Sequence, residues 1–263
     1  MGFFKEKIWQ DKKKRALFIT LSSVFLALIL IFTACAIYLG SYYRADDEAV
    51  SAFSFSTGYT ITETQTEDGN WVFAPQKDEV DTGFIFYPGG KVEHDAYIPL
   101  MRALAVEGVF CVLIEMPFRL AVFDIDAADG IAEGYPQIKN WYIGGHSLGG
   151  SMAASYVSKH TADFKGLILL AAYSTENLQN SGLRVLSVYG DKDGVLNRGK
   201  YNENKCNLPQ DYTEYIIEGG NHAYFGMYGK QKGDGEATVD NGYQIILTAH
   251  QIRVFMDIGF IGV

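Results

Sequence analysis

The pentapeptide GHSLG at residues 145–149 is the feature that most constrains how this chain folds. It follows an apolar run at 141–143 and precedes a stretch of small residues that we expect to form a helix over about 150–160. A chain that turns sharply from strand to helix has almost no room for side chains beside the turn, and glycine on both sides meets this requirement. The turn lifts the hydroxyl of Ser147 clear of the sheet and points the first helical amides at the group it attacks. Ser147 is therefore a candidate nucleophile, although a turn that only connects two elements explains the motif equally well.

Strands and helices alternate along the rest of the chain. Short apolar runs bounded by turn residues predict strands covered on both faces, and helical patterns lie between them. Such an alternation favours a mostly parallel, doubly wound sheet with its chemistry at the carboxyl ends of the strands. We expect an antiparallel hairpin at 59–64 and 71–73, strands at 83–87, 109–114, 141–143, 166–170, 184–189 and 212–217, and helices at 95–107, 122–131, 150–160 and 242–256.

The chain resembles the α/β-hydrolase superfamily, and most closely its compact dienelactone-hydrolase-like branch, also described as alpha/beta hydrolase fold-5. The resemblance covers about 82–256 and rests on FYPGG at 86–90, GHSLGG at 145–150, GDKDG at 190–194 and GGNH at 219–222. It implies an α/β-hydrolase fold, with a catalytic serine, aspartate and histidine in that order along the chain. Dienelactone hydrolases proper carry cysteine at the nucleophile position. Ser147 therefore favours ordinary serine esterase chemistry over that substrate.

Candidates for the base and the acid follow two later strands. A serine hydroxyl needs an adjacent base, and an imidazole with a pKa of roughly 6.5 suits that task. His222 lies in a loop straight after a strand, where its side chain can reach the serine turn. A carboxylate must then orient the imidazole, and both Asp191 and Asp193 follow the strand at 184–189. In related hydrolases the acid commonly lies three residues after the glycine, which favours Asp193 over Asp191.

Backbone amides are the expected partners of a tetrahedral oxyanion. The amide of Leu148, directly after the serine, is one candidate donor. The loop after the strand at 83–87 supplies the second, from Gly90 or Lys91, because its glycines let the backbone approach a substrate closely. The turn at 88–90 can serve this purpose and connect two elements at once. We expect no metal or organic cofactor, since no pair of histidines shows metal-ligand spacing.

Three further residues are candidates for contact with substrate. Arg119 ends another strand at the same edge of the sheet, where it binds a substrate carboxylate or pairs with a neighbouring acid, either Asp124 or Asp126. We favour the pairing. Tyr224 and Phe225 follow His222 and are expected to form an apolar wall near the site.

An apolar segment near the N-terminus predicts a membrane anchor. Residues 16–43 carry no charged side chain, and a helix over 16–39 is long enough to cross a hydrocarbon core of ~30 Å. Six basic residues before it favour a cytoplasmic N-terminus and an extracytoplasmic domain. A cleaved signal peptide, a lipoprotein site at Cys35 and a buried core helix are the alternatives. We expect a cytoplasmic segment at 1–15, a transmembrane helix at 16–40, a linker at 41–58 and the α/β-hydrolase domain at 59–263.

The charge balance of the remainder excludes one class of partner. Beyond residue 44 the chain carries 15 basic and 29 acidic residues, a net charge of −14, which repels nucleic acid. Its length suits one α/β domain. Cys111 and Cys206 form either a disulfide or two free thiols, of which we favour the thiols.

These features together predict a single-pass membrane protein with an extracytoplasmic serine hydrolase domain. We expect it to act on a small-molecule or envelope-derived acyl substrate and to cleave an ester or related acyl bond through Ser147, His222 and Asp193. An acyltransferase with the same triad, or a noncatalytic surface-binding module on this fold, remains an alternative. The oligomeric state stays open.

Overall fold

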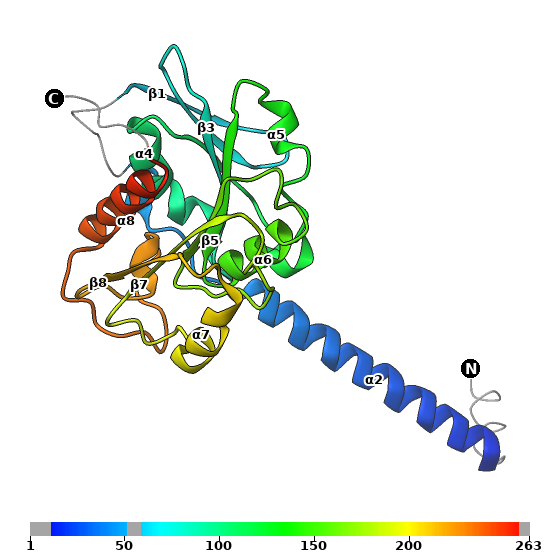
Figure 1. The fold of residues 1–263 in the computed structure, drawn as a ribbon. Helices are drawn as coiled ribbons and strands as arrows, with labels where there is room; N and C mark the ends of the chain where they lie inside the picture. Colours follow the sequence, from blue (N-terminus) through cyan, green and yellow to red (C-terminus); the bar gives the residue numbers. More distant parts are fainter. Residues whose placement is uncertain (1–11, 52–58, 258–263) are drawn as a thin grey trace. The chain divides into compact units, whose positions relative to one another are not determined.

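The computed structural model describes residues 12–51 and 59–257, and the chain divides into two compact units with the boundary after Ser41. The described part of the first unit is one helix, α2 (Lys12–Gly40), which is apolar and long enough to cross a membrane. The second unit holds the sheet and the remaining helices. Both units are drawn in Figure 1.

The second unit is built on one eight-stranded sheet in the order β1-β2-β4-β3-β5-β6-β7-β8. β1 and β2 form the expected antiparallel hairpin, and β2 joins β4 antiparallel. All other neighbours are parallel. The strands are β1 (Ile61–Gln65), β2 (Trp71–Pro75), β3 (Thr82–Tyr87), β4 (Phe110–Leu113), β5 (Asn140–His146), β6 (Gly166–Leu170), β7 (Arg184–Gly190) and β8 (Thr213–Ile217).

Helices cover both faces of this sheet, as the alternation predicts. Successive strand residues point to opposite faces, so Phe84 and Phe86 pack in one core while Ile85 and Tyr87 pack in the other. Figure 1 shows α4 and α8 on the first side and α6 on the second. The helices are α3 (Asp47–Ser51), α4 (Ile98–Val106), α5 (Ile131–Gly134), α6 (Leu148–Val157), α7 (Arg198–Asn204) and α8 (Asn241–Phe255), with 3-10 turns η1 (His94–Tyr97), η2 (Pro117–Arg119), η3 (Ala121–Phe123), η4 (Lys205–Asn207) and η5 (Ala223–Phe225).

The prediction of a helix over 122–131 is wrong. Only the short turn η3 and the single-turn helix α5 form there, with irregular turns between them. The hydroxyl of Tyr87 donates to the carbonyl of Ile125 at 2.8 Å and accepts the amide of Ala128 at 2.9 Å. These two backbone groups therefore bond to Tyr87 and not to other backbone groups of a helix. Gly130 adds a left-handed residue with φ 75°. The polar helix α7, which the sequence analysis does not anticipate, is capped by the side chain of Asn197.

The first residues of the sheet unit are hydrogen-bonded to the loop after β3. Tyr43, within the segment 41–58 expected to be a linker, donates its amide to the carbonyl of Lys91 at 2.7 Å and accepts the amide of Glu93 at 2.9 Å. The short helix α3 follows, and part of the expected linker lies outside the described residues.

The thiols are unpaired, as favoured. Cys111 is buried in β4, and Cys35 and Cys206 are exposed free cysteines.

Candidate active site

The serine turn joins β5 directly to α6 and carries backbone strain. Ser147 has φ 52° and ψ −121°, a left-handed conformation that is uncommon for a residue with a side chain. A Cβ on Gly149 would lie 2.2 Å from the carbonyl oxygen of Pro88, and one on Gly145 would lie 2.4 Å from that of Tyr87. Glycine at both positions therefore lets the turn pack against the end of β3.

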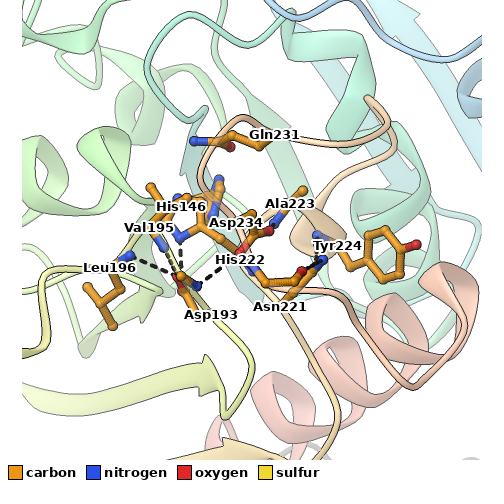
Figure 2. Close-up of polar contacts among 12 residues, drawn as sticks. His146, Asp193, Val195, Leu196, Asn221, His222, Ala223, Tyr224, Gln231 and Asp234 are labelled. Atoms are coloured by element: carbon orange, nitrogen blue, oxygen red, sulfur yellow. Dashed lines mark hydrogen bonds and ion pairs between the residues drawn. The ribbon is translucent and has the colours of Figure 1, made fainter.

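His222 and Asp193 meet in the interior behind this edge of the sheet. The Nδ1 atom of His222 lies 2.9 Å from Oδ2 of Asp193, and their side chains are 1% and 0% exposed. The other carboxylate oxygen accepts the amides of Val195 at 2.9 Å and Leu196 at 2.8 Å, as Figure 2 shows. An ionised carboxylate only accepts, so a proton on Nδ1 of His222 would donate to Asp193. Nε2 is buried and has no hydrogen-bond partner in the described part of the chain.

Asp191 has a different set of contacts. Its Oδ1 accepts the amide of Gly219 at 2.6 Å, and its Oδ2 pairs with Nζ of Lys192 at 3.0 Å. The hydrogen bond from Lys192 lowers the pKa of Asp191 below its ordinary value. Of the two candidate acids, the structure brings Asp193 to His222 and uses Asp191 to hold the turn before it.

The loop after β3 lies against the residue that follows Ser147. The amide of Gly89 donates to the hydroxyl of Tyr97 at 3.1 Å, and the amide of Lys91 donates to the carbonyl of Arg119 at 2.7 Å. Gly90 lies between them, and a Cβ built on it would be 2.8 Å from the side chain of Leu148. Of the two candidates in this loop, the Lys91 amide is already bonded, while Gly90 adjoins the residue after Ser147.

A second histidine packs behind His222. The Nδ1 atom of His146 lies 2.8 Å from the hydroxyl of Tyr97, and the His146 ring centroid lies 4.5 Å from that of His222. The Tyr97 oxygen also accepts the amide of Gly89, so it joins His146 to the loop after β3. Burial lowers the pKa of His146 well below its ordinary value. His146 is therefore neutral at pH 7.

Asp234 is the supporting residue that the sequence analysis misses. Its carboxylate accepts four backbone amides, three of which belong to the loops of the acid and the base. The donors are Gly194 at 3.1 Å, His222 at 3.2 Å, Ala223 at 2.8 Å and Gly235 at 2.8 Å. Figure 2 shows Asp234 beside the His222 loop. Nothing in its glycine-rich, polar surroundings signals this role, because all its partners are backbone groups.

The three expected substrate contacts are placed differently from one another. The Arg119 guanidinium lies 3.6 Å from the centroid of the Tyr42 ring and 3.8 Å from a carboxylate oxygen of Glu93, so its acidic neighbour is Glu93 and not Asp124 or Asp126.

The two aromatic residues after His222 also differ from each other. Phe225 is fully buried against the His146 ring, with centroids 5.5 Å apart, so it supports the site from behind. Tyr224 is half-buried, and its amide donates to the side chain of Asn221 at 3.0 Å. Within residues 12–51 and 59–257, no group of three or more His, Cys, Asp or Glu side chains is placed to hold a metal ion.

The buried, neutral His146 predicts how stability changes with pH. Its pKa is lowered in the folded protein, so the unfolded chain binds the extra proton as pH falls below ~6.5. Wild type should therefore lose stability from pH 7.5 to 5, with His146 contributing at most about 1.4 kcal/mol per pH unit. Urea unfolding of the full chain in detergent measures this slope. His146→Gln should flatten it, whereas His160→Gln, at a half-exposed position, should not; equal slopes in wild type and His146→Gln would contradict the assignment.

Comparison with known proteins agrees with this geometry. The sequence model of the alpha/beta hydrolase family matches residues 83–245, more than half of the chain. Among solved structures, the chain is similar to a predicted CIB-like hydrolase from Thermoplasma acidophilum, with a TM-score of 0.51 and 16% identity over 75% of this chain and 100% of that one. That likeness shows the fold alone. No curated protein sequence matches significantly. By fold and by sequence, the chain belongs to the alpha/beta hydrolase family.

Proposed function

We propose that the chain is a membrane-anchored, extracytoplasmic serine hydrolase that cleaves a carboxylic ester or related acyl bond through an acyl-enzyme. The carrying observation is the buried pair of His222 and Asp193, whose imidazole keeps an unpartnered Nε2. A buried polar atom without a partner is costly, so its presence points to a group that bonds there during turnover. The strained turn of Ser147 at the same edge of the sheet provides the matching nucleophile.

Each side chain has one role in the proposed reaction. The Ser147 hydroxyl attacks the acyl carbon while its proton moves to Nε2 of His222, and Asp193 holds the Nδ1 proton and stabilises the imidazolium. The amides of Leu148 and Gly90 bind the oxyanion, helped by the positive end of the ten-residue helix α6. The Nε2 proton then passes to the leaving alcohol. Water repeats the sequence on the acyl-enzyme, which releases the acid and restores Ser147.

The proposed location rests on α2. Its 29 residues exceed the ~20 needed to span a bilayer, and none of them is buried in the protein. Basic residues stand at its start, whereas its last turn carries none. This asymmetry favours a cytoplasmic N-terminus and an external hydrolase unit.

The nucleophile is tested with a fluorophosphonate probe, which reacts with activated serines. Wild type should be labelled and Ser147→Ala should not, because in the proposed mechanism His222 activates Ser147. Ser151→Ala, one helical turn later on α6, is the matched control and should keep full labelling. An unlabelled wild type that also leaves a panel of esters intact would favour the noncatalytic surface-binding module. Product analysis with competing alcohols and amines separates hydrolysis from acyl transfer.

The acid is tested by two neighbouring substitutions. Asp193→Asn should lower kcat for ester hydrolysis by about 10³–10⁴-fold, because the amide no longer fixes the Nδ1 proton. Asp191→Asn should cost less than about tenfold, since it contacts only the turn at Gly219 and Lys192. Steady-state kinetics on one chromogenic ester measures both. Similar mild losses in the two variants would reject Asp193 as the acid.

The orientation is tested through the exposed Cys206. A membrane-impermeant maleimide added to intact cells should label wild type, because we place Cys206 outside and Cys35 within the bilayer. Cys206→Ser should abolish the labelling, since Cys111 is buried. Labelling that requires permeabilised cells would place the hydrolase unit in the cytoplasm.

A further inference from the structure

A short loop after β4 exposes three large apolar side chains together. In this apolar rim loop, defined as residues 117–123, Phe118 is 58% exposed, Val122 45% and Phe123 56%. The rings of Phe118 and Phe123 meet edge to face with centroids 5.8 Å apart. Leu120 on the inner side of the loop is buried. The loop therefore has an apolar outer surface that it does not cover itself.

Only the inner side of this loop, at Arg119 and Leu120, lies beside the serine turn. The carbonyl of Arg119 accepts the amide of Lys91, and the Leu120 side chain lies 3.6 Å from where a Cβ on Gly90 would stand. Phe118 and Arg119 have φ of 53° and 59°, a left-handed conformation that bulky residues adopt only when the surroundings hold it. The strained backbone turns Leu120 inward while the Phe118 side chain remains exposed.

The same loop contacts Tyr42, the first residue of the sheet unit. The Arg119 guanidinium packs 3.6 Å above the ring of Tyr42. Tyr42 is two residues beyond Gly40, the end of α2, so the chain between them spans at most about 7 Å. With α2 in a bilayer, Tyr42 falls in the interfacial layer, where tyrosine is favoured. The next residue, Tyr43, is fixed to the sheet unit by the hydrogen bond from its amide to the carbonyl of Lys91.

We propose that the apolar rim loop seats in the outer leaflet of the bilayer that holds α2. The active site then opens at the membrane surface and accepts an ester whose acyl chain lies in the bilayer. Burial of Phe118, Val122 and Phe123 among lipid chains removes their apolar surface from water, and the short tether keeps them within reach. The inferred substrate class rests on the proposed function. The insertion of the loop into the bilayer requires only that α2 spans the membrane.

Depth-dependent fluorescence quenching tests the seating. The full chain is reconstituted in phosphatidylcholine vesicles with bromine on the acyl chains, as Phe118→Trp or as Val254→Trp. Val254 is 46% exposed near the end of α8. Asp257, just after α8, pairs with Arg184 at the start of β7. This end of α8 therefore lies at the edge of the sheet opposite the serine turn. After subtraction of the wild-type emission from the three native tryptophans, we expect a blue shift and quenching for Trp at 118, and neither at 254. Equal quenching at the two positions would overturn the proposal.

Activity on two esters then tests the consequence for substrate. Phe118→Ser/Phe123→Ser should lower turnover of a long-chain ester in the same vesicles about tenfold or more. It should leave turnover of a soluble acetate ester unchanged, and Val254→Ser should change neither. Equal losses on both esters would overturn the link to membrane-borne substrate. A wild type inactive on both esters would refute the proposed function, and the quenching would still decide the seating. If the quenching at 118 depends on protein concentration, the loop is covered by a second copy of the chain and not by the bilayer, and the proposal is wrong.

Discussion

Close packing between the turn after β5 and the end of β3 is the constraint on which the site depends. Methyl groups at Gly145 and Gly149 would collide with the carbonyls of Tyr87 and Pro88, and only glycine removes that clash. β3 and β5 are parallel neighbours, with Tyr87 opposite Gly145, so both strands end at the same level. This packing places the loop of Gly90 beside the serine turn. The contact between the two loops follows from the register of the central strands.

Behind this edge, buried polar groups hold the imidazole in place. Asp193 uses one oxygen for His222 and the other for two backbone amides, so its carboxylate has little freedom to rotate. Asp234 bonds the amides of both supporting loops, and the neutral His146 packs against the imidazole ring without adding a charge. Asp193 meets His222 across 29 residues of sequence, and Asp234 meets Gly194 across 40. Geometry at the site is thus a property of the folded interior and not of any one loop.

The strands and the serine turn were predictable because their signals are local. Apolar runs and paired glycines reflect burial and close approach at the same residues, so β3, β5 and the Ser147 turn follow from the sequence. Long-range contacts gave no such signal. The hydroxyl of Tyr87 replaces the helix expected at 122–131, Asp234 binds only backbone groups, and Arg119 meets Glu93 and Tyr42 instead of its near neighbours. In each case a partner distant in sequence outweighs the local pattern.

The order of the strands also determines when Ser147, Asp193 and His222 can come together during folding. Ser147 needs only the centre of the sheet, whereas Asp193 and His222 follow β7 and β8, the last two strands to emerge. β8 is an edge strand that pairs with β7 alone, so the base takes its position only after both have docked. During synthesis from the N-terminus, Ser147 is therefore made before the histidine that we propose as its base. On the proposed mechanism, Ser147 becomes reactive only after the C-terminal portion of the chain has been released and has folded.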